Sequence, residues 1–318
     1  MKKKDAYIEL RIPKAIFRTI PLWLVILLVI NSSMLVGFTE YYFMKKNFND
    51  AVIELSKKTK SPEELVQILK QQVIPQKGFA LGVVWNDVGK QLIGSGAIDQ
   101  KKYEELFVNE SQAKAEMRYL VNASKDHMVI TESNARFMVN TLWAFGLVNK
   151  SKLLDEGAMK TEGGGNHMNY ASTGGFSLGA KATSELYSST PIIKLTTEQE
   201  ELVQRISQNV YRPCCNNPAS FPDCNHGMAA LGYIELAVSQ GLSEKEIYKD
   251  VLALNSFWFP QTYVEQAAYF QKQAKAWGSI DPKIALSKQY SSAQGAQIVS
   301  QSVQDVPGLQ TPGGGCAA

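Results

Sequence analysis

The sequence predicts a mainly α-helical protein with an N-terminal membrane anchor. Residues 19–39 contain an uncharged, mostly apolar run, and about 20 such residues are enough for a helix to cross a bilayer. Beyond this run, apolar residues recur at helical spacing behind the Ser, Thr and Pro residues typical of helix starts. We therefore expect a single transmembrane helix, then a helical domain that ends in a three- to four-helix bundle.

The charges around the apolar run predict its orientation. Two lysines follow the run closely, whereas six cations precede it in a basic tail over residues 1–18: Lys2, Lys3, Lys4, Arg11, Lys14 and Arg18. The positive-inside rule places this tail in the cytoplasm and the rest of the chain on the extracytoplasmic side. The run is longer than the apolar core of a signal peptide, and no small-residue cleavage site follows it. We expect an uncleaved, single-pass anchor in the cytoplasmic membrane.

The charge distribution argues against nucleic acid as a partner. The whole chain carries a net charge of +3, but its first 18 residues alone carry +4, so the remainder carries −1. A nucleic-acid-binding domain would concentrate basic residues outside the anchor. The glycine-containing segments fit neither a P-loop nor a dinucleotide-binding fingerprint. The expected partners are the membrane and another protein.

Residues 40–160 form the first predicted helical region. One helix begins at SPEELVQIL, with Ser61 as its N-cap and Pro62 in its first turn. A second is predicted from TESNARFMVNTLWAFG, with Thr131 as a cap and Gly146 as the stop. Residues 161–195 are rich in Gly, Ser and Thr but contain three aromatic residues. This segment is either a flexible linker or an ordered loop that packs on the domain.

Residues 196–285 form the predicted cysteine-containing bundle. Thr197 and Glu200 suggest a capping box at its first helix, and Ser243 with Glu246 suggests another. Pro260 is expected to start the last helix. The chain then becomes Ser- and Gln-rich over residues 286–318, where we expect a flexible tail that ends in GGGCAA and carries the thiol of Cys316.

Three of the four cysteines lie in one segment, YRPCCNNPASFPDCNHG. An extracytoplasmic location permits a disulfide between Cys224 and either Cys214 or Cys215, which would be a structural staple. An unpaired thiol would then remain available for redox chemistry. The start of the next helix, near His226, would lower the pKa of a neighbouring thiol. His226, Arg212 and Asp223 are candidates for tuning these thiols.

The same segment also supports a metal site. Cys214, Cys215, Cys224 and His226 offer four ligands within a short stretch, although their spacing matches no common zinc motif. Each histidine of the chain has a methionine within two residues, and thiolate, imidazole and thioether together suit copper(I). A soft metal ion, copper or zinc, is thus the candidate cofactor.

Residues 211–260 resemble the membrane-tethered thiol-reductase subunit of the cytochrome c maturation system. The shared features are an arginine before Cys214, then DCNHGMAA, then GLSEKEIYKDVLAL, in the same order. The resemblance implies a three-helix domain and dithiol chemistry on a protein partner. Asn217 occupies the position of the family's second cysteine. The resemblance therefore implies that Cys214 is the first thiol and that Cys215 or Cys224 replaces the second.

Three functions remain open from the sequence. The first is dithiol–disulfide exchange by Cys214, Cys215 and Cys224, with Cys316 as a resolving thiol on its tail. The second is binding and delivery of a soft metal by the same segment. The third is a disulfide-stapled scaffold for a membrane complex.

Overall fold

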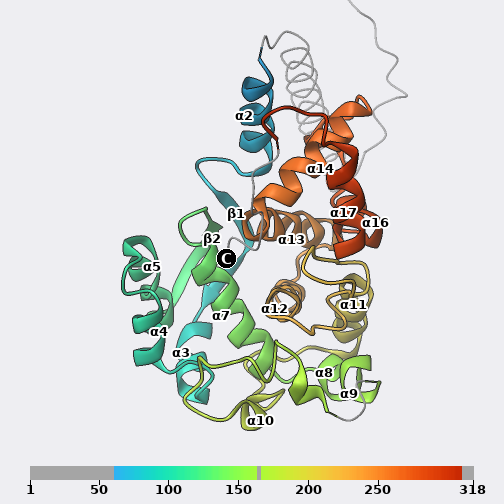
Figure 1. The fold of residues 1–318 in the computed structure, drawn as a ribbon. Coiled ribbons are helices and arrows are strands. Elements are labelled where there is room, and N and C mark those ends of the chain that lie inside the picture. Colours follow the sequence, from blue (N-terminus) through green and yellow to red (C-terminus); the bar gives the residue numbers. More distant parts are fainter. Residues whose placement is uncertain (1–60, 163–165, 310–318) are drawn as a thin grey trace, which may run out of the picture. The chain divides into compact units, whose positions relative to one another are not determined.

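A computed structural model describes residues 61–162 and 166–309 (Figure 1). The predicted basic tail, the anchor over residues 19–39 and Cys316 lie outside these residues. The described chain is mainly helical, as expected. Within it, no helix is long and apolar enough to cross a membrane.

The first half of the described chain combines short helices with two strands. In chain order its elements are α2 (Pro62–Val73), β1 (Phe79–Asn86), α3 (Val88–Ser95), α4 (Gln100–Leu106), α5 (Ser111–Glu116), α6 (Arg118–Val121), β2 (Ser124–Ile130), α7 (Ala135–Val148), α8 (Lys152–Glu156) and α9 (Ala158–Thr161). Strands β1 and β2 pair antiparallel, with Phe79 opposite Ile130. We expected only helices here, although Leu81, Val83 and Trp85 alternate with less buried residues in the pattern of a half-buried strand.

The regular elements of the second half are all helices. Its elements are the 3-10 helix η2 (His167–Asn169), α10 (Thr183–Leu186), α11 (Thr197–Ser207), α12 (Asn225–Ser239), α13 (Glu244–Trp258), α14 (Pro260–Lys272), the 3-10 helix η3 (Trp277–Ser279), α15 (Pro282–Ala285), α16 (Lys288–Ser291) and α17 (Ala293–Ser302). The predicted capping box of Ser243 and Glu246 is confirmed at α13. The box at α11 lies one residue earlier than predicted, at Thr196 and Gln199.

Helix α12 lies among α7, α11 and α13 (Figure 1). Gly146 of α7 and Gly232 of α12 face each other, and a Cβ at Gly232 would lie 2.8 Å from the backbone nitrogen of Gly146. These glycines allow the two helices to cross in backbone contact. Gly146 therefore does not end α7, which begins at Ala135 rather than behind Thr131 and continues to Val148. One hydrophobic core joins the two halves of the described chain.

The Gly/Ser/Thr-rich segment is an ordered loop where the structure describes it. Trp143 Nε1 donates a hydrogen bond of 2.8 Å to the carbonyl of Ser172, and the Trp143 ring packs edge-on against Phe176. The backbone nitrogen of Ser172 also donates to the carbonyl of Asp223, at 3.1 Å. This loop therefore packs on the core and supports the cysteine segment.

The flexible tail predicted from residue 286 is wrong for the part that the structure describes. Residues 288–302 form α16 and α17, and α17 packs on α14. The Ser292 side chain caps α17 by accepting a hydrogen bond of 3.0 Å from Gly295. Ala296, Val299 and Val303 are buried, and their spacing forms a helical apolar stripe among the Ser and Gln residues.

Candidate functional site

The cysteine segment is a loop between α11 and α12 that backbone hydrogen bonds hold at several points. Tyr211 donates from its nitrogen to the carbonyl of Leu286 at 2.9 Å, and Ala293 donates to the carbonyl of Cys215 at 2.8 Å. The side chain of Asn216 accepts a further bond from the backbone of Gln294. The helices that we expected to be a flexible tail thus fix the loop that carries the thiols.

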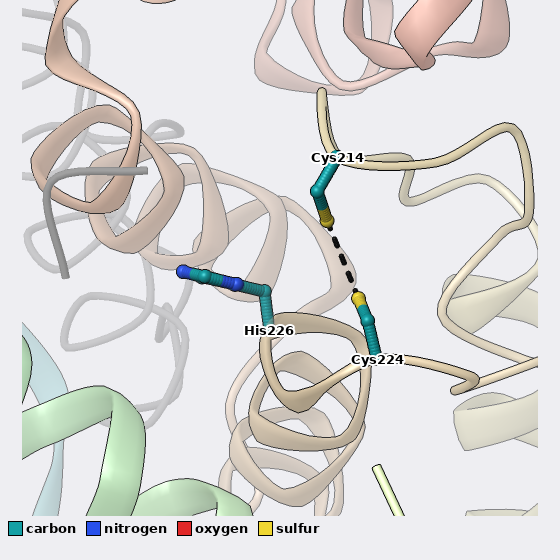
Figure 2. A group of neighbouring side chains, drawn as sticks. All are labelled: Cys214, Cys224 and His226. Atoms are coloured by element: carbon teal, nitrogen blue, oxygen red, sulfur yellow. Dashed lines mark hydrogen bonds between the residues drawn. The ribbon is translucent and has the colours of Figure 1, made fainter. Parts of the chain in front are cut away.

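Two of the three thiols in this loop contact each other. The Sγ atoms of Cys214 and Cys224 lie 3.3 Å apart. Figure 2 shows Cys214 on the loop and Cys224 at the start of α12, with their sulfurs directed toward one another. Cys214 is exposed and Cys224 is half-buried. The structure therefore places Cys214 and Cys224 in contact as free thiols, while the Cys215 sulfur lies within 4.8 Å of the Cys224 sulfur and of a carboxylate oxygen of Asp223.

Arg212 is completely buried beneath the thiols. Its Nε donates a hydrogen bond of 3.1 Å to the sulfur of Cys224, and its Nη1 donates to the carbonyl of Asn217 at 2.8 Å. Its Nη2 bonds with the carboxylate of Asp223 and with the carbonyl of Phe221. The guanidinium is therefore fixed by four partners, one of which is a reactive sulfur.

Glycine at position 227 makes room for this guanidinium. A Cβ at Gly227 would lie 2.4 Å from Cζ of Arg212, much closer than two non-bonded heavy atoms approach. Gly227 occupies the first turn of α12, and its backbone nitrogen donates to the sulfur of Cys224 at 3.4 Å. Cys224 is the N-cap of this helix. Its sulfur thus occupies the position where the positive end of the helix dipole stabilises an anion.

These contacts separate the pKa values of the three thiols. Hydrogen bonds from Cys214 and Cys215, together with the charge of Arg212, hold the pKa of Cys224 well below its ordinary value, although burial opposes this. Hydrogen bonding with Cys215 and Cys224 and burial raise the pKa of Cys214. For Cys215, a hydrogen bond with Cys214 favours the thiolate, but its bond to Cys224 and burial outweigh this and raise the pKa to about 11. The arrangement favours one thiolate, on Cys224.

Asp223 also binds the guanidinium and holds the loop together. Its carboxylate pairs with Arg212 and accepts a hydrogen bond of 2.9 Å from the side-chain amide of Asn217. The thiol of Cys215 donates to the same carboxylate at 3.6 Å. Burial alone would lower the pKa of Arg212, but the thiols and Asp223 raise it, so the guanidinium stays charged.

His226 packs beside the cysteine pair. Its imidazole extends away from the two sulfurs (Figure 2) and lies against the rings of Phe259 and Trp258, with ring centroids 4.4 and 5.7 Å away. A ring nitrogen of His226 and the sulfurs of Cys214 and Cys224 nevertheless lie within 4.8 Å of one another. These three residues can thus supply a partial set of soft-metal ligands.

The histidine–methionine pattern does not converge on this site. The ring of His127 bonds the carbonyl of Leu81, and His167 packs against Tyr187 at 4.6 Å. Met128 and Met228 are core residues. Among the described residues, the possible ligand groups near the cysteines contain neither His127 nor His167. The pattern therefore reflects packing.

Two residues important to the site were not identified from the sequence. Asn217 was noted only as the residue at the position of the family's second cysteine, but it bonds both Arg212 and Asp223. The sequence predicts no role for Gly227, but it accommodates the guanidinium. In the sequence, Arg212 and Gly227 lie on either side of the cysteine loop. No local sequence pattern indicates that these two residues contact each other.

Comparison with models of protein families, with curated proteins and with solved structures yields no match. The functional argument therefore depends on the geometry of the site.

Proposed function

We propose that this protein performs dithiol–disulfide exchange with a protein partner, and that Cys214 and Cys224 are its working pair. The observation that carries the proposal is the position of the Cys224 sulfur, 3.3 Å from Cys214 and 3.1 Å from the buried guanidinium of Arg212. A thiolate beside a second thiol is the arrangement required for exchange through a mixed disulfide. The predicted N-terminal anchor would hold this pair at the extracytoplasmic face of the membrane.

The buried charge of Arg212 favours disulfide exchange over a purely structural disulfide. A staple between Cys214 and Cys224 would close a short loop and constrain the unfolded chain. It would not require a buried cation bonded to one of its sulfurs, because a disulfide carries no charge. Cys214 is also the exposed residue of the pair, whereas Cys224 is half-buried, so a partner's thiol reaches Cys214 more readily.

Soft-metal binding is the second candidate, because Cys214, Cys224 and His226 bring three ligand atoms within 4.8 Å. Thiolate and imidazole suit copper(I) or zinc. The buried guanidinium counts against it, because a metal ion would lie close to a permanent positive charge. Elemental analysis of the full-length protein, with thiol titration before and after chelation, tests this candidate. Stoichiometric metal whose removal exposes the thiols would replace the exchange proposal.

The exchange proposal is tested by substituting one cysteine at a time in the full-length, detergent-solubilised protein. Each variant also carries Cys316→Ser, so that the tail thiol does not contribute. We expect Cys214→Ser and Cys224→Ser each to abolish catalysed reduction of a small disulfide by dithiol. The comparison variant Cys215→Ser, whose hydroxyl can still donate a hydrogen bond to Cys224, should retain catalysis. Equal rates in all three variants would contradict the proposal.

A further inference from the structure

The two sulfurs of the proposed pair have different surroundings. The Cys214 sulfur belongs to an exposed residue on the loop, and it bonds with Cys224. The Cys224 sulfur is half-buried and accepts hydrogen bonds from Arg212 Nε and from the backbone nitrogen of Gly227. A partner can therefore reach Cys214 more easily, while Cys224 is the sulfur that the protein stabilises.

Oxidation of the pair would weaken the hydrogen bonds to Cys224. A thiolate is a strong acceptor, whereas a disulfide sulfur is a weak one. The other donors of Arg212 already bond with Asn217, Phe221 and Asp223, and the arginine is completely buried. In the disulfide form, its Nε–H would keep only a poor partner, which is costly for a buried charged donor. The site therefore favours the reduced form over the disulfide.

We infer that the Cys214–Cys224 pair works in the oxidising direction, as a disulfide donor to a protein or peptide dithiol, with Cys214 as the attacked sulfur and Cys224 as the leaving group. A pair whose reduced form is stabilised is a strong oxidant. This inference rests on the proposed exchange function and adds its direction and substrate class. It reverses the direction implied by the resemblance to a thiol reductase.

The reaction has two exchange steps. A substrate thiolate attacks Sγ of Cys214; the substrate–Cys214 disulfide forms, the Cys214–Cys224 bond breaks, and its electron pair leaves on Sγ of Cys224 beside Arg212. The second substrate thiolate then attacks the substrate sulfur of this mixed disulfide. The substrate disulfide forms and the Cys214 thiolate leaves. The substrate loses two electrons and two protons; Cys214 takes up one proton and the other enters solvent. A disulfide of another partner protein re-oxidises the pair.

Cys215 provides the internal control for this assignment. It is next to Cys214 in the chain, but its thiol bonds with the Asp223 carboxylate and with the carbonyl of Asn217. Those contacts direct it into the loop rather than toward a partner. Cys215→Ser should therefore leave the site of attack on Cys214 unchanged.

The first test locates the attack in the oxidised full-length protein carrying Cys316→Ser. A peptide with a single cysteine is added, the reaction is quenched with acid, and the modified cysteine is identified by peptide mapping. We expect the peptide on Cys214, in both this protein and its Cys215→Ser variant. The peptide on Cys224 would overturn the assignment of the attacked sulfur. Absence of any peptide adduct or exchange would overturn the proposed function as well.

The second test measures direction by equilibrating the same protein with reduced and oxidised glutathione. We expect the pair to be more oxidising than glutathione. Arg212→Lys, which keeps the charge but removes the Nε donor, should shift the equilibrium at least tenfold toward the disulfide, or about 30 mV. The control is Arg205→Lys at an exposed ion pair, which should not shift it. A pair that exchanges but is more reducing than glutathione would overturn the direction and leave the exchange function standing. If Arg212→Lys does not fold, the wild-type potential still decides.

Discussion

Gly227→Ala tests whether the guanidinium of Arg212 controls the site. The new methyl group would lie 2.4 Å from both Cζ and Nη2 of Arg212. A flexible arginine could move aside, but this one is completely buried and bonds with four partners. We therefore expect the guanidinium to shift and to lose its hydrogen bond to Cys224.

The expected magnitude follows from opposing contributions. Overpacking a buried site costs about 1–3 kcal/mol, and losing a hydrogen bond to a charged group costs about 1.5–3 kcal/mol. Replacing a helical glycine by alanine stabilises the helix by up to about 1 kcal/mol, which offsets part of this loss. The net expectation is a loss of about 1.5–6 kcal/mol in the free energy of unfolding. The pKa of the Cys224 thiol should also rise toward its ordinary value, since Arg212 is one of the groups that lower it.

Urea denaturation of the reduced protein measures the stability, and alkylation against pH measures the thiol. The matched control is Gly94→Ala, because Gly94 is exposed in α3 and a Cβ there meets no atom within 4 Å. That control should be unchanged or more stable by up to about 1 kcal/mol. If Gly227→Ala were as stable as wild type and alkylated at Cys224 with the same pH profile, the role assigned to Arg212 would be refuted.

Two further predictions concern the scaffold. Burial raises the pKa of Glu235 to about 8 from an ordinary 4.5, against the hydrogen bond of 2.9 Å from the side-chain amide of Asn149, which lowers it. The folded protein therefore binds a proton on the Glu235 carboxyl more tightly than the unfolded chain does. The contribution of this protonation to the stability of the fold is complete below pH 4.5 and is lost as the pH rises to about 8. At about 1.4 kcal/mol per pKa unit this amounts to about 4–5 kcal/mol. Glu235→Gln should flatten the decline in thermal unfolding temperature over this range, and an unchanged slope would contradict the assignment. Ser292→Ala removes the cap of α17 and should cost about 1 kcal/mol in the free energy of unfolding. Because the backbone nitrogen of Ala293 donates a hydrogen bond to the carbonyl of Cys215, hydrogen exchange in the cysteine loop should also increase. Protection equal to wild type would contradict that coupling.

Local signals in the sequence were sufficient for most of the larger helices. Ser61, Ser243 and Pro260 each mark a helix start that the structure confirms. These signals act within one turn, so neighbouring residues contain them. The strand β1 was missed although its alternating burial was readable at Leu81, Val83 and Trp85. Helix α17 was missed because small and polar residues interrupt the apolar pattern along its sequence.

The site was only partly predictable for a different reason. Arg212, Asp223, His226 and the three cysteines at 214, 215 and 224 were identified as candidates, and all of these lie in or beside one loop. The choice of Cys214 over Cys215 as the partner of Cys224 depends on a contact that adjacency in sequence does not determine. Burial of the guanidinium depends on Gly227, on Asn217 and on the packing of α16 and α17 against the loop. Such long-range contacts produce no periodic pattern in the sequence from which they could be predicted.

The most direct test of the account is the pH dependence of alkylation at each cysteine of the reduced, full-length protein, followed by mass spectrometry. Cys224 should react as a thiolate well below the ordinary thiol pKa of 9.0, whereas Cys215 should titrate near 11. Cys214→Ala, which removes the donor, should raise the apparent pKa of Cys224, because the Cys214 hydrogen bond is the largest cause of its lowering. If all three thiols instead titrate together near 9, Cys224 is not a stabilised thiolate and the account of the site is wrong.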